Sequence, residues 1–309
     1  MTKTRMALAL GTALALFGCG GGGGDAESKA RVPLSTANYD DVASAVVDSV
    51  SGTGPIFDAF DFVVEDTGPT EPTRSPYAAL GTGQMGPIAA FALRQLRAGP
   101  QAREAALAVE TETVRCASGS LQVTVNDADN NDEVSAGDSV TLLASQCVFE
   151  TGQPAVNGSL SLRVNSIQFD RYGEVSSAGV GLNFTQFSIG DLTLNGAATV
   201  SASGGDVTLA YRHLTARVDD QSLVYNYTLT VRQGSLAVNG SLSLNDSTYR
   251  LSTLQPISMG RVYPNGGQLK ITDGHGAYVL SNLQPSGYVN RLFLAGDDLV
   301  DATGPLHPW

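Results

Sequence analysis

A run of oxygen-bearing side chains between residues 127 and 138 is the part of the sequence best suited to chemistry. Calcium takes about six to eight oxygen ligands, and a twelve-residue loop supplies them from positions 1, 3, 5, 7, 9 and 12. Those positions hold Asp127, Asp129, Asn131, Glu133, Ser135 and Asp138. The spacing predicts a structural calcium ion bound by these six residues, with Glu133 contributing its backbone carbonyl.

The loop resembles the calcium loop of EF-hand and dockerin-like repeats, with two departures. Asp132 stands where those loops have a glycine at the sharp turn, and Asp138 replaces their bidentate glutamate. The flanks favour strands, because Leu121, Val123 and Val125 alternate with polar residues. The resemblance therefore covers the loop and not the EF-hand fold. The alternative is an acidic hairpin turn that binds no metal.

The first nineteen residues are typical of an export signal. Lys3 and Arg5 give a positive start, residues 6–17 are mostly apolar, and the small Gly18 precedes Cys19. Such a stretch is too short to span about 30 Å of hydrocarbon as a helix. The run from Leu16 to Cys19 resembles the bacterial lipobox, which implies that Cys19 is acylated and anchors the protein in a membrane. The alternative is a signal that is cleaved without lipidation.

The residues after Cys19 agree with an anchor. Gly20 to Gly24 are consecutive glycines and predict a flexible tether. By resemblance, glycine rather than aspartate after the cysteine implies the outer membrane of a Gram-negative cell, with the body facing the periplasm or the cell surface. The chain resembles uncharacterised proteobacterial outer-membrane lipoproteins, and the stretch from Pro264 to Asp301 shares this likeness. That family implies no activity.

The two remaining cysteines predict a disulfide. An exported protein meets an oxidising environment, in which cysteines pair by default. Cys116 lies eleven residues before Asp127, and Cys147 lies nine residues after Asp138. This near-symmetry would place the two sulfurs opposite each other across a hairpin. In the loop-entropy model such a disulfide is worth about 3–4 kcal/mol.

The rest of the chain, from about Leu107 onward, predicts a β body. Alternating apolar and polar residues, separated by Gly, Asn, Asp and Pro, indicate roughly a dozen long strands. Ala155–Leu162 recurs identically at Ala237–Leu244, and Thr193–Val200 is a looser copy. Each copy contains Asn-Gly, which we interpret as a bulge or bend inside a strand, with a second turn as the alternative. The glycines five residues before each Asn are interpreted as turns: Gly152, Gly190 and Gly234.

Two helices and a loop are expected ahead of the strands. Residues 38–50 predict a helix capped by Ser35 or Thr36, residues 52–76 a loop, and residues 87–97 a second short helix that begins at Pro87. The predicted fold is mainly β, a large curved antiparallel sheet or half-open barrel with one or two N-terminal helices packed on it. The predicted organisation is a signal peptide at 1–18, the lipidated cysteine and tether at 19–34, a helical and loop region at 35–104 and the β body at 105–309.

Charge and motif content exclude some functions. The 309 residues include 30 Asp+Glu and 18 Lys+Arg, a net charge of -12, with a pI near 4.6. Such a chain is unsuited to nucleic acid, which attracts basic proteins. The sequence has no G-x-S-x-G, H-E-x-x-H or C-x-x-C motif. Nothing in the spacing of His213 and His275 selects a catalytic serine. We therefore expect no nucleic-acid partner and no catalytic site.

Two functions remain. The first is a lipid-anchored envelope protein of structural, adhesive or binding role, with a calcium-stabilised hairpin and an unidentified protein partner. The second is a carrier of lipid or another apolar ligand. A curved sheet with helices in its concave face resembles the lipoprotein-carrier superfamily, and Leu182, Phe184 and Leu192 are aliphatic or aromatic residues suited to such a face. This resemblance is architectural, and architecture does not determine function. We therefore favour the first.

Overall fold

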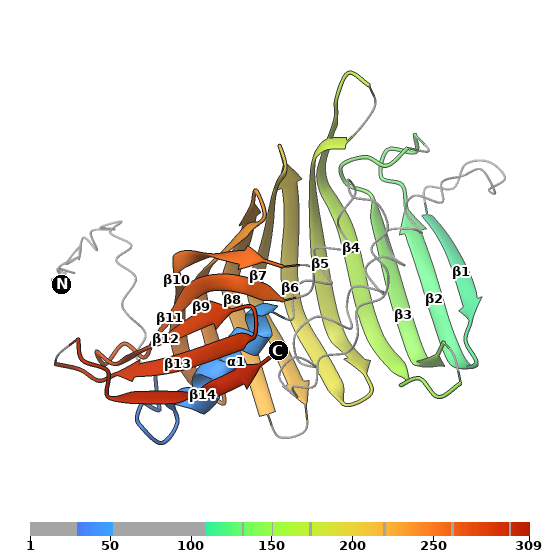
Figure 1. Cartoon of the computed structure of the whole chain (residues 1–309). Coiled ribbons are helices and arrows are strands. Elements are labelled where there is room, and N and C mark those ends of the chain that lie inside the picture. Colours follow the sequence, from blue (N-terminus) through green and yellow to red (C-terminus); the bar gives the residue numbers. More distant parts are fainter. Residues whose placement is uncertain are drawn as a thin grey trace, which may run out of the picture.

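The computed structural model describes residues 30–51, 109–131, 133–149, 151–172, 175–218, 221–260, 263–296 and 298–309. These ranges contain one helix and fourteen strands (Figure 1). The helix is α1 (Tyr39–Ser51). The strands are β1 (Val109–Arg115), β2 (Ser118–Asn126), β3 (Ser139–Val148), β4 (Val156–Phe169), β5 (Val175–Ile189), β6 (Leu192–Ser203), β7 (Asp206–Val218), β8 (Gln221–Arg232), β9 (Ser235–Leu244), β10 (Ser247–Met259), β11 (Pro264–Thr272), β12 (Tyr278–Gln284), β13 (Gly287–Phe293) and β14 (Ala302–Pro308).

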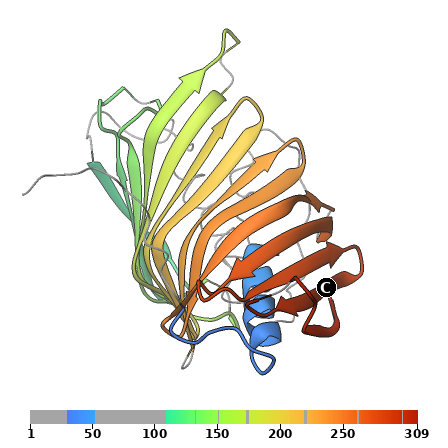
Figure 2. The ribbon, with the colours of Figure 1, turned by 90° about the vertical axis from the view of Figure 1, so that its left-hand side faces the viewer.

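All fourteen strands belong to one antiparallel sheet, in which each strand pairs with the strands that precede and follow it in sequence. Among the described strands, β1 and β14 each have one neighbour, so the sheet is open. The sheet curls, and its C-terminal strands bend around α1, which lies in the hollow (Figures 1 and 2). The prediction of a mainly β protein with a large curved antiparallel sheet and an N-terminal helix packed on it is confirmed.

Strict alternation along the strands produces the two faces of the sheet. In β8, Leu223, Tyr225, Tyr227 and Leu229 are buried and the residues between them are not. Successive side chains of a strand point to opposite faces, and directly paired residues of neighbouring strands share a face. The buried side chains form one apolar core with the valines of α1. We call the face toward α1 the inner face and the opposite face the outer face.

The sheet bends where the Asn-Gly repeats cross it. Gly158, Gly196 and Gly240 lie within strands with φ of 84°, 118° and 139°. A Cβ on Gly158 or Gly196 would overlap the carbonyl oxygen of Gln186 or His213, respectively, on the next strand. The pairing register shifts at Gly158 and at Gly196, as it does at β-bulges. The predicted bends are confirmed, and the glycines five residues before each Asn lie in turns as expected.

The helix α1 forms close to where the sequence predicts it. It begins at Tyr39, and the carbonyl of Ser35, one of the two expected caps, accepts a hydrogen bond of 3.0 Å from the Tyr39 N–H. The Oδ1 atom of Asn38 accepts a hydrogen bond of 2.8 Å from the Ser35 N–H. The apolar face of α1 packs mainly against β9, β11, β12 and β13. The loop predicted at 52–76 and the helix predicted at 87–97 lie outside the described residues.

The chain ahead of α1 is bound to the sheet, although the sequence places residues 30–34 in the tether. Asp273 accepts both hydrogen bonds: its backbone carbonyl accepts from the Ala30 N–H over 2.7 Å, and its carboxylate accepts from the Leu34 N–H over 3.0 Å. Asp273 is fully buried in the turn between β11 and β12. His275, predicted to lie in a hairpin turn, is in the same turn, with Nε2 2.9 Å from the carbonyl oxygen of Ala30.

The two edge strands carry features that discourage pairing with another chain. Glu110 and Glu112 in β1 pair with Val125 and Val123 of β2 and so lie on the inner face. A charged side chain that points inward at an edge disfavours the burial that a further strand would bring. In β14, prolines 305 and 308 lack the N–H that a partner strand needs.

Candidate functional site

The turn between β2 and β3 brings together three of the six predicted calcium ligands. The carboxylates of Asp127, Asp129 and Asp138 each offer an oxygen atom, and these oxygens all lie within 4.8 Å of one another. Asp138 is buried at 3% exposure, Asp127 is half-buried and Asp129 is exposed. The arrangement concentrates negative charge at one point that opens to solvent on the side of Asp129.

Local hydrogen bonds hold two of these carboxylates in place. Asp138 accepts from the N–H of Ala128 at 2.9 Å and from the N–H of Ser135 at 2.6 Å. Asp127 accepts from the N–H of Asn130 at 2.7 Å. Aspartate side chains commonly close turns by bonding nearby backbone N–H groups. The loop therefore positions its carboxylates with its own backbone.

The other predicted ligands surround the three carboxylates less directly. Asn131 donates from Nδ2 to Asp129 over 2.9 Å, and its Oδ1 accepts the Glu133 N–H over 2.7 Å. The Ser135 hydroxyl donates to Asp138 over 3.3 Å. Glu133, predicted to contribute its backbone carbonyl, is exposed. Asp132, at the expected glycine position, lies outside the described residues.

Both ends of the β2–β3 hairpin are fastened. At the loop end, the Gly137 N–H donates to the Val164 carbonyl and the Val164 N–H to the Asp138 carbonyl, each over 2.8 Å. At the other end, Cys116 and Cys147 form the predicted disulfide, with Cα atoms 5.4 Å apart. Cys147 is fully buried. The acidic loop is thus the exposed tip of a firmly held hairpin.

The membrane anchor is not part of the described structure. Cys19 and the predicted signal peptide lie outside the described residues. No helix in the described part of the chain is long and apolar enough to span a membrane.

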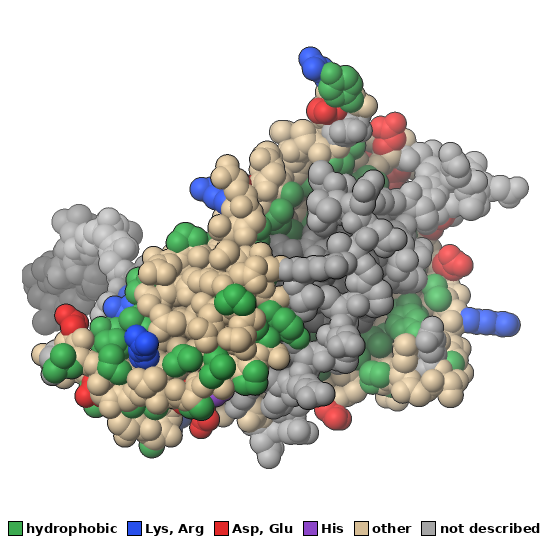
Figure 3. Space-filling model, in the orientation of Figure 1, with side chains coloured by type: hydrophobic (Ala, Val, Ile, Leu, Met, Phe, Trp, Pro, Cys, Tyr) green, Lys and Arg blue, Asp and Glu red, His purple; other side chains and the backbone are tan. Residues whose placement is uncertain are grey.

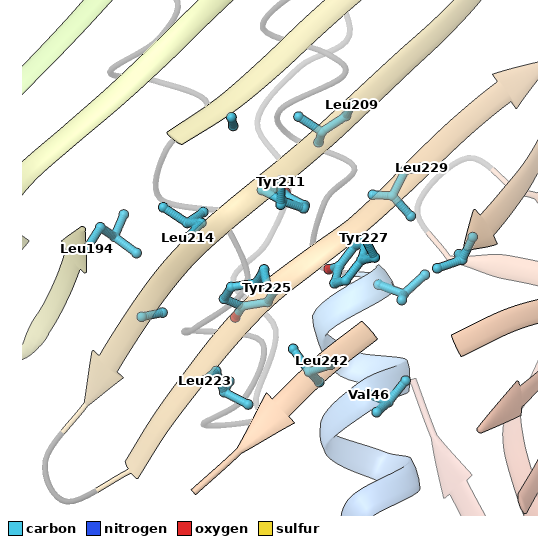
Figure 4. Packing of buried hydrophobic residues seen from close by; sticks show 14 of the residues in the cluster. Val46, Leu194, Leu209, Tyr211, Leu214, Leu223, Tyr225, Tyr227, Leu229 and Leu242 are labelled. Carbon is cyan, nitrogen blue, oxygen red and sulfur yellow. The ribbon is translucent and has the colours of Figure 1, made fainter. Parts of the chain in front are cut away.

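The inner face contains a group of buried tyrosines beside α1. The ring of Tyr211 lies 5.5 Å from the ring of Tyr225 and 5.1 Å from that of Tyr227, measured between centroids (Figure 4). The Tyr227 hydroxyl lies 3.5 Å from the Ser49 carbonyl oxygen. Burial raises the pKa of Tyr225 and of Tyr227 well above the ordinary tyrosine value. Both tyrosines therefore stay neutral and act as apolar bodies with a polar tip.

A small pocket lies where the C-terminal end of α1 meets β9 to β12. Apart from Ser51 its lining is apolar: Val47, Val50, Leu236, Ile257, Pro264, Leu269 and Leu283. Such a lining suits an apolar group, because it makes van der Waals contacts and no hydrogen bonds. This pocket is the described feature that bears most closely on the carrier alternative.

Sequence reasoning missed a polar cluster between α1 and the last two strands. Asn290, fully buried, accepts from the Ser281 hydroxyl over 2.7 Å and donates to Asp40 over 2.8 Å. The His307 ring stacks on that of Tyr288, with centroids 4.9 Å apart. Burial is the main cause that raises the pKa of Tyr288. No local sequence signal identifies the cluster, because its members lie far apart in the chain.

No protein family, curated protein or solved structure matches this chain.

Proposed function

We propose that the protein is a lipid-anchored β protein of the bacterial cell envelope. In this proposal Cys19 is acylated and holds the chain in the outer membrane, and the β body has a structural, adhesive or binding role. Calcium stabilises the β2–β3 hairpin. The observation that supports the calcium site best is the approach of the carboxylates of Asp127, Asp129 and Asp138 to within 4.8 Å.

The electrostatics of the loop favour a divalent cation. Carboxylates that lie this close repel one another when all are ionised. A calcium ion removes that repulsion and accepts carboxylate, amide and carbonyl oxygens as ligands. Asp127 and Asp138 are held by backbone N–H groups, so two ligands are positioned before the ion arrives. Calcium in this loop would stiffen the hairpin rather than catalyse a reaction.

Calcium titration tests this site. A cation that binds only the folded protein at about 100 times its Kd stabilises it by roughly 2.7 kcal/mol. We therefore expect the melting temperature of the purified chain to rise with calcium and to fall again with EDTA. Asp129→Asn should abolish the rise, because the exposed Asp129 supports the fold least among the three. Asp246→Asn removes an equal charge from the β9–β10 turn and should retain the rise. Identical melting with calcium and with EDTA would contradict the proposal.

Cell fractionation tests the anchor. The chain should be recovered in the membrane fraction and should incorporate labelled fatty acid, whereas Cys19→Ala should do neither. A wild-type chain that is soluble and unlabelled would show that the proposed anchor is wrong.

The curved sheet with α1 in its hollow keeps one second function open, that of a carrier for an apolar ligand, although the described pocket beside α1 has room for only about one water molecule. Its lining continues the buried inner face, and architecture of this type resembles the lipoprotein carriers. Native mass spectrometry of the chain purified from cells tests it. A reproducible excess mass of several hundred daltons, lost after organic extraction, would favour the carrier. A bare mass, or one increased by calcium alone, would favour the first proposal.

A further inference from the structure

The charged side chains of the strands are segregated between the two faces of the sheet. Among the described strands, the acidic residues are Glu110 and Glu112 on the inner face and Asp206, which is ion-paired with Arg232 at 2.8 Å. All other charged side chains in these strands are basic: Arg115, Arg163, Arg212, Arg217, Arg250, Lys270 and Arg291. From β4 onward, each of them directly follows a buried residue of its strand and so belongs to the outer face. In a chain with a net charge of -12, the strands thus carry mainly basic side chains on the outer face. Charged side chains of either sign are sparse on the side of the molecule that Figure 3 shows.

The strand register places three of these residues on one line. Arg163, Lys270 and Arg291 belong to a row of direct cross-strand partners that runs from β3 to β14. The row consists of Ser139, Arg163, Gly181, Thr199, Ala210, Thr228, Asn239, Ser252, Lys270, Leu280, Arg291 and Thr303. None of its members is buried. At about 4.8 Å per strand the row follows the curved surface for roughly 50 Å.

A second row lies two residues along each strand and carries two more basic residues. It consists of Thr141, Ser161, Asn183, Ala197 and Arg212, followed by Asn226, Ser241, Arg250, Thr272, Tyr278 and Phe293. Near its end the rings of Tyr278 and Phe293 stack with centroids 4.6 Å apart. The Lys270 ammonium lies 4.1 Å from the centroid of the Tyr278 ring. We call the two rows together the outer track.

The chemistry of the outer track is that of a long, hydrogen-bonding cationic surface. Its two rows contain five basic side chains and no acidic one, and most of their other members bear hydroxyl or amide groups. At the β12–β13 end, Phe293 is buried and the Tyr278 hydroxyl lies 3.5 Å from the Asp298 carboxylate. The basic groups are spread over many strands, so a ligand that meets them all must be long and must carry repeated negative charge. Complementary charge steers and orients such a ligand.

We propose that the outer track binds a linear anionic polysaccharide. Sugar hydroxyls match the Ser, Thr and Asn side chains that lie between the basic residues, and the carboxylate groups of such a polymer match the basic residues themselves. A flexible chain can follow a convex sheet, whereas a flat bilayer touches it along a narrow strip only. The inference rests on the binding role proposed above and names its partner class, but it depends on neither the anchor nor the calcium loop.

Binding to sodium alginate, a polyuronate, tests this inference with the full chain in a neutral detergent. We expect alginate to bind, neutral dextran to bind far more weakly, and the affinity for alginate to fall as sodium chloride is raised. Arg163→Gln/Arg212→Gln/Arg291→Gln removes three exposed charges from the track. If each exposed ionic contact is worth roughly twofold, this variant should bind alginate about tenfold more weakly.

A matched control keeps the total charge equal. Arg31→Gln/Arg171→Gln/Arg232→Gln removes three exposed basic residues from outside the track and should change the affinity less than about twofold. Unchanged melting curves for both variants verify that they fold. Equal weakening in both variants, or alginate binding no tighter than dextran, would overturn the inference.

Two further probes distinguish other polyanions. Tighter binding to phosphatidylglycerol vesicles or to a single-stranded oligonucleotide than to alginate would overturn the assignment to a polysaccharide. Membrane fractionation of the wild-type chain, together with its alginate binding, separates this inference from the anchor. A wild-type chain that is found in the membrane but does not bind alginate refutes only the inference. A soluble chain that binds alginate refutes only the anchor.

Discussion

Both carboxylate oxygens of Asp40 lie 3.0 Å from Nε2 of His307, a residue 267 positions later in the chain. Asp40 is in the first turn of α1 and His307 is in the edge strand β14. The same carboxylate accepts a hydrogen bond from Asn290, which is fully buried. Asp40 therefore joins the helix to the last two strands of the sheet.

Removing the Asp40 carboxylate should destabilise the protein. Asp40→Ala deprives the buried Asn290 amide of an acceptor, which costs about 1–3 kcal/mol. The neighbouring Asp41 is exposed, so Asp41→Ala should change the free energy of unfolding by no more than about 0.5 kcal/mol. Urea unfolding of the two variants measures the difference. Equal stabilities would show that the contact with Asn290 and His307 contributes nothing.

The bend at Gly158 should not tolerate a side chain. Gly158→Ala combines a strained positive φ with a Cβ that overlaps the Gln186 carbonyl, so we expect a loss of at least about 3 kcal/mol. Gly204 also has positive φ, but a Cβ there meets open space. Gly204→Ala should therefore cost only about 1 kcal/mol. Thermal melting compares the two variants, and a similar small loss in both would contradict the proposed role of the bend.

Stability should fall in alkaline solution because of the buried tyrosines. Burial raises the pKa of Tyr225 and Tyr227 in the folded state, so above pH 10 the unfolded chain loses protons that the folded chain keeps. Their contribution to stability is complete below pH 10 and is lost as the pH rises toward the folded-state pKa. Above pH 10, where the unfolded chain has lost the proton and the folded chain still holds it, each buried tyrosine should lower the free energy of unfolding by about 1.4 kcal/mol for each further pH unit.

Tyrosine-to-phenylalanine variants isolate this effect. Tyr225→Phe/Tyr227→Phe should flatten the decline of stability between pH 10 and 11, measured by urea unfolding at each pH. Tyr172 is exposed, and Tyr172→Phe should leave the slope unchanged. If the double variant declines as steeply as the wild type, other groups govern alkaline unfolding.

Reduction of the disulfide should weaken the N-terminal part of the sheet. The bond between Cys116 and Cys147 spans 31 residues, and its loss should cost about 3–4 kcal/mol in the loop-entropy model. The wild type should therefore melt at a lower temperature with a reductant, while Cys116→Ser/Cys147→Ser should melt at the same lower temperature with and without it. A wild-type curve that the reductant leaves unchanged would contradict this expectation.

Sequence patterns predicted the parts of the fold that depend on local chemistry. The alternation in β8 identified a buried face, and the Asn-Gly pairs identified bends, because glycine reaches positive φ without a steric penalty. The disulfide followed from its position around a single hairpin. For the acidic loop, spacing predicted six ligands, and the structure shows that Asp138 also bonds the backbone of Ala128 and Ser135.

Long-range relationships were beyond such reasoning. The positive φ of Gln186 and His213 arises where their strands meet glycine bends of a neighbour. The bonds of Asp40 depend on where α1 lies in the hollow. Likewise, alternation places Arg163, Lys270 and Arg291 on one face, but only the register of all the strands between them places them on one row.

The consecutive order of the strands has a consequence for assembly. Each described strand can pair with its predecessor as soon as it has been synthesised, so the sheet can grow from β1 to β14 in the order of synthesis, mostly through contacts between near neighbours in sequence. The helix α1 is synthesised before all of these strands, yet it packs mainly on β9, β11, β12 and β13. It can therefore dock on the sheet only after almost the whole chain has been made. We expect that its docking is the last step of folding and that, until then, the N-terminal region is the part of the chain most in need of a chaperone.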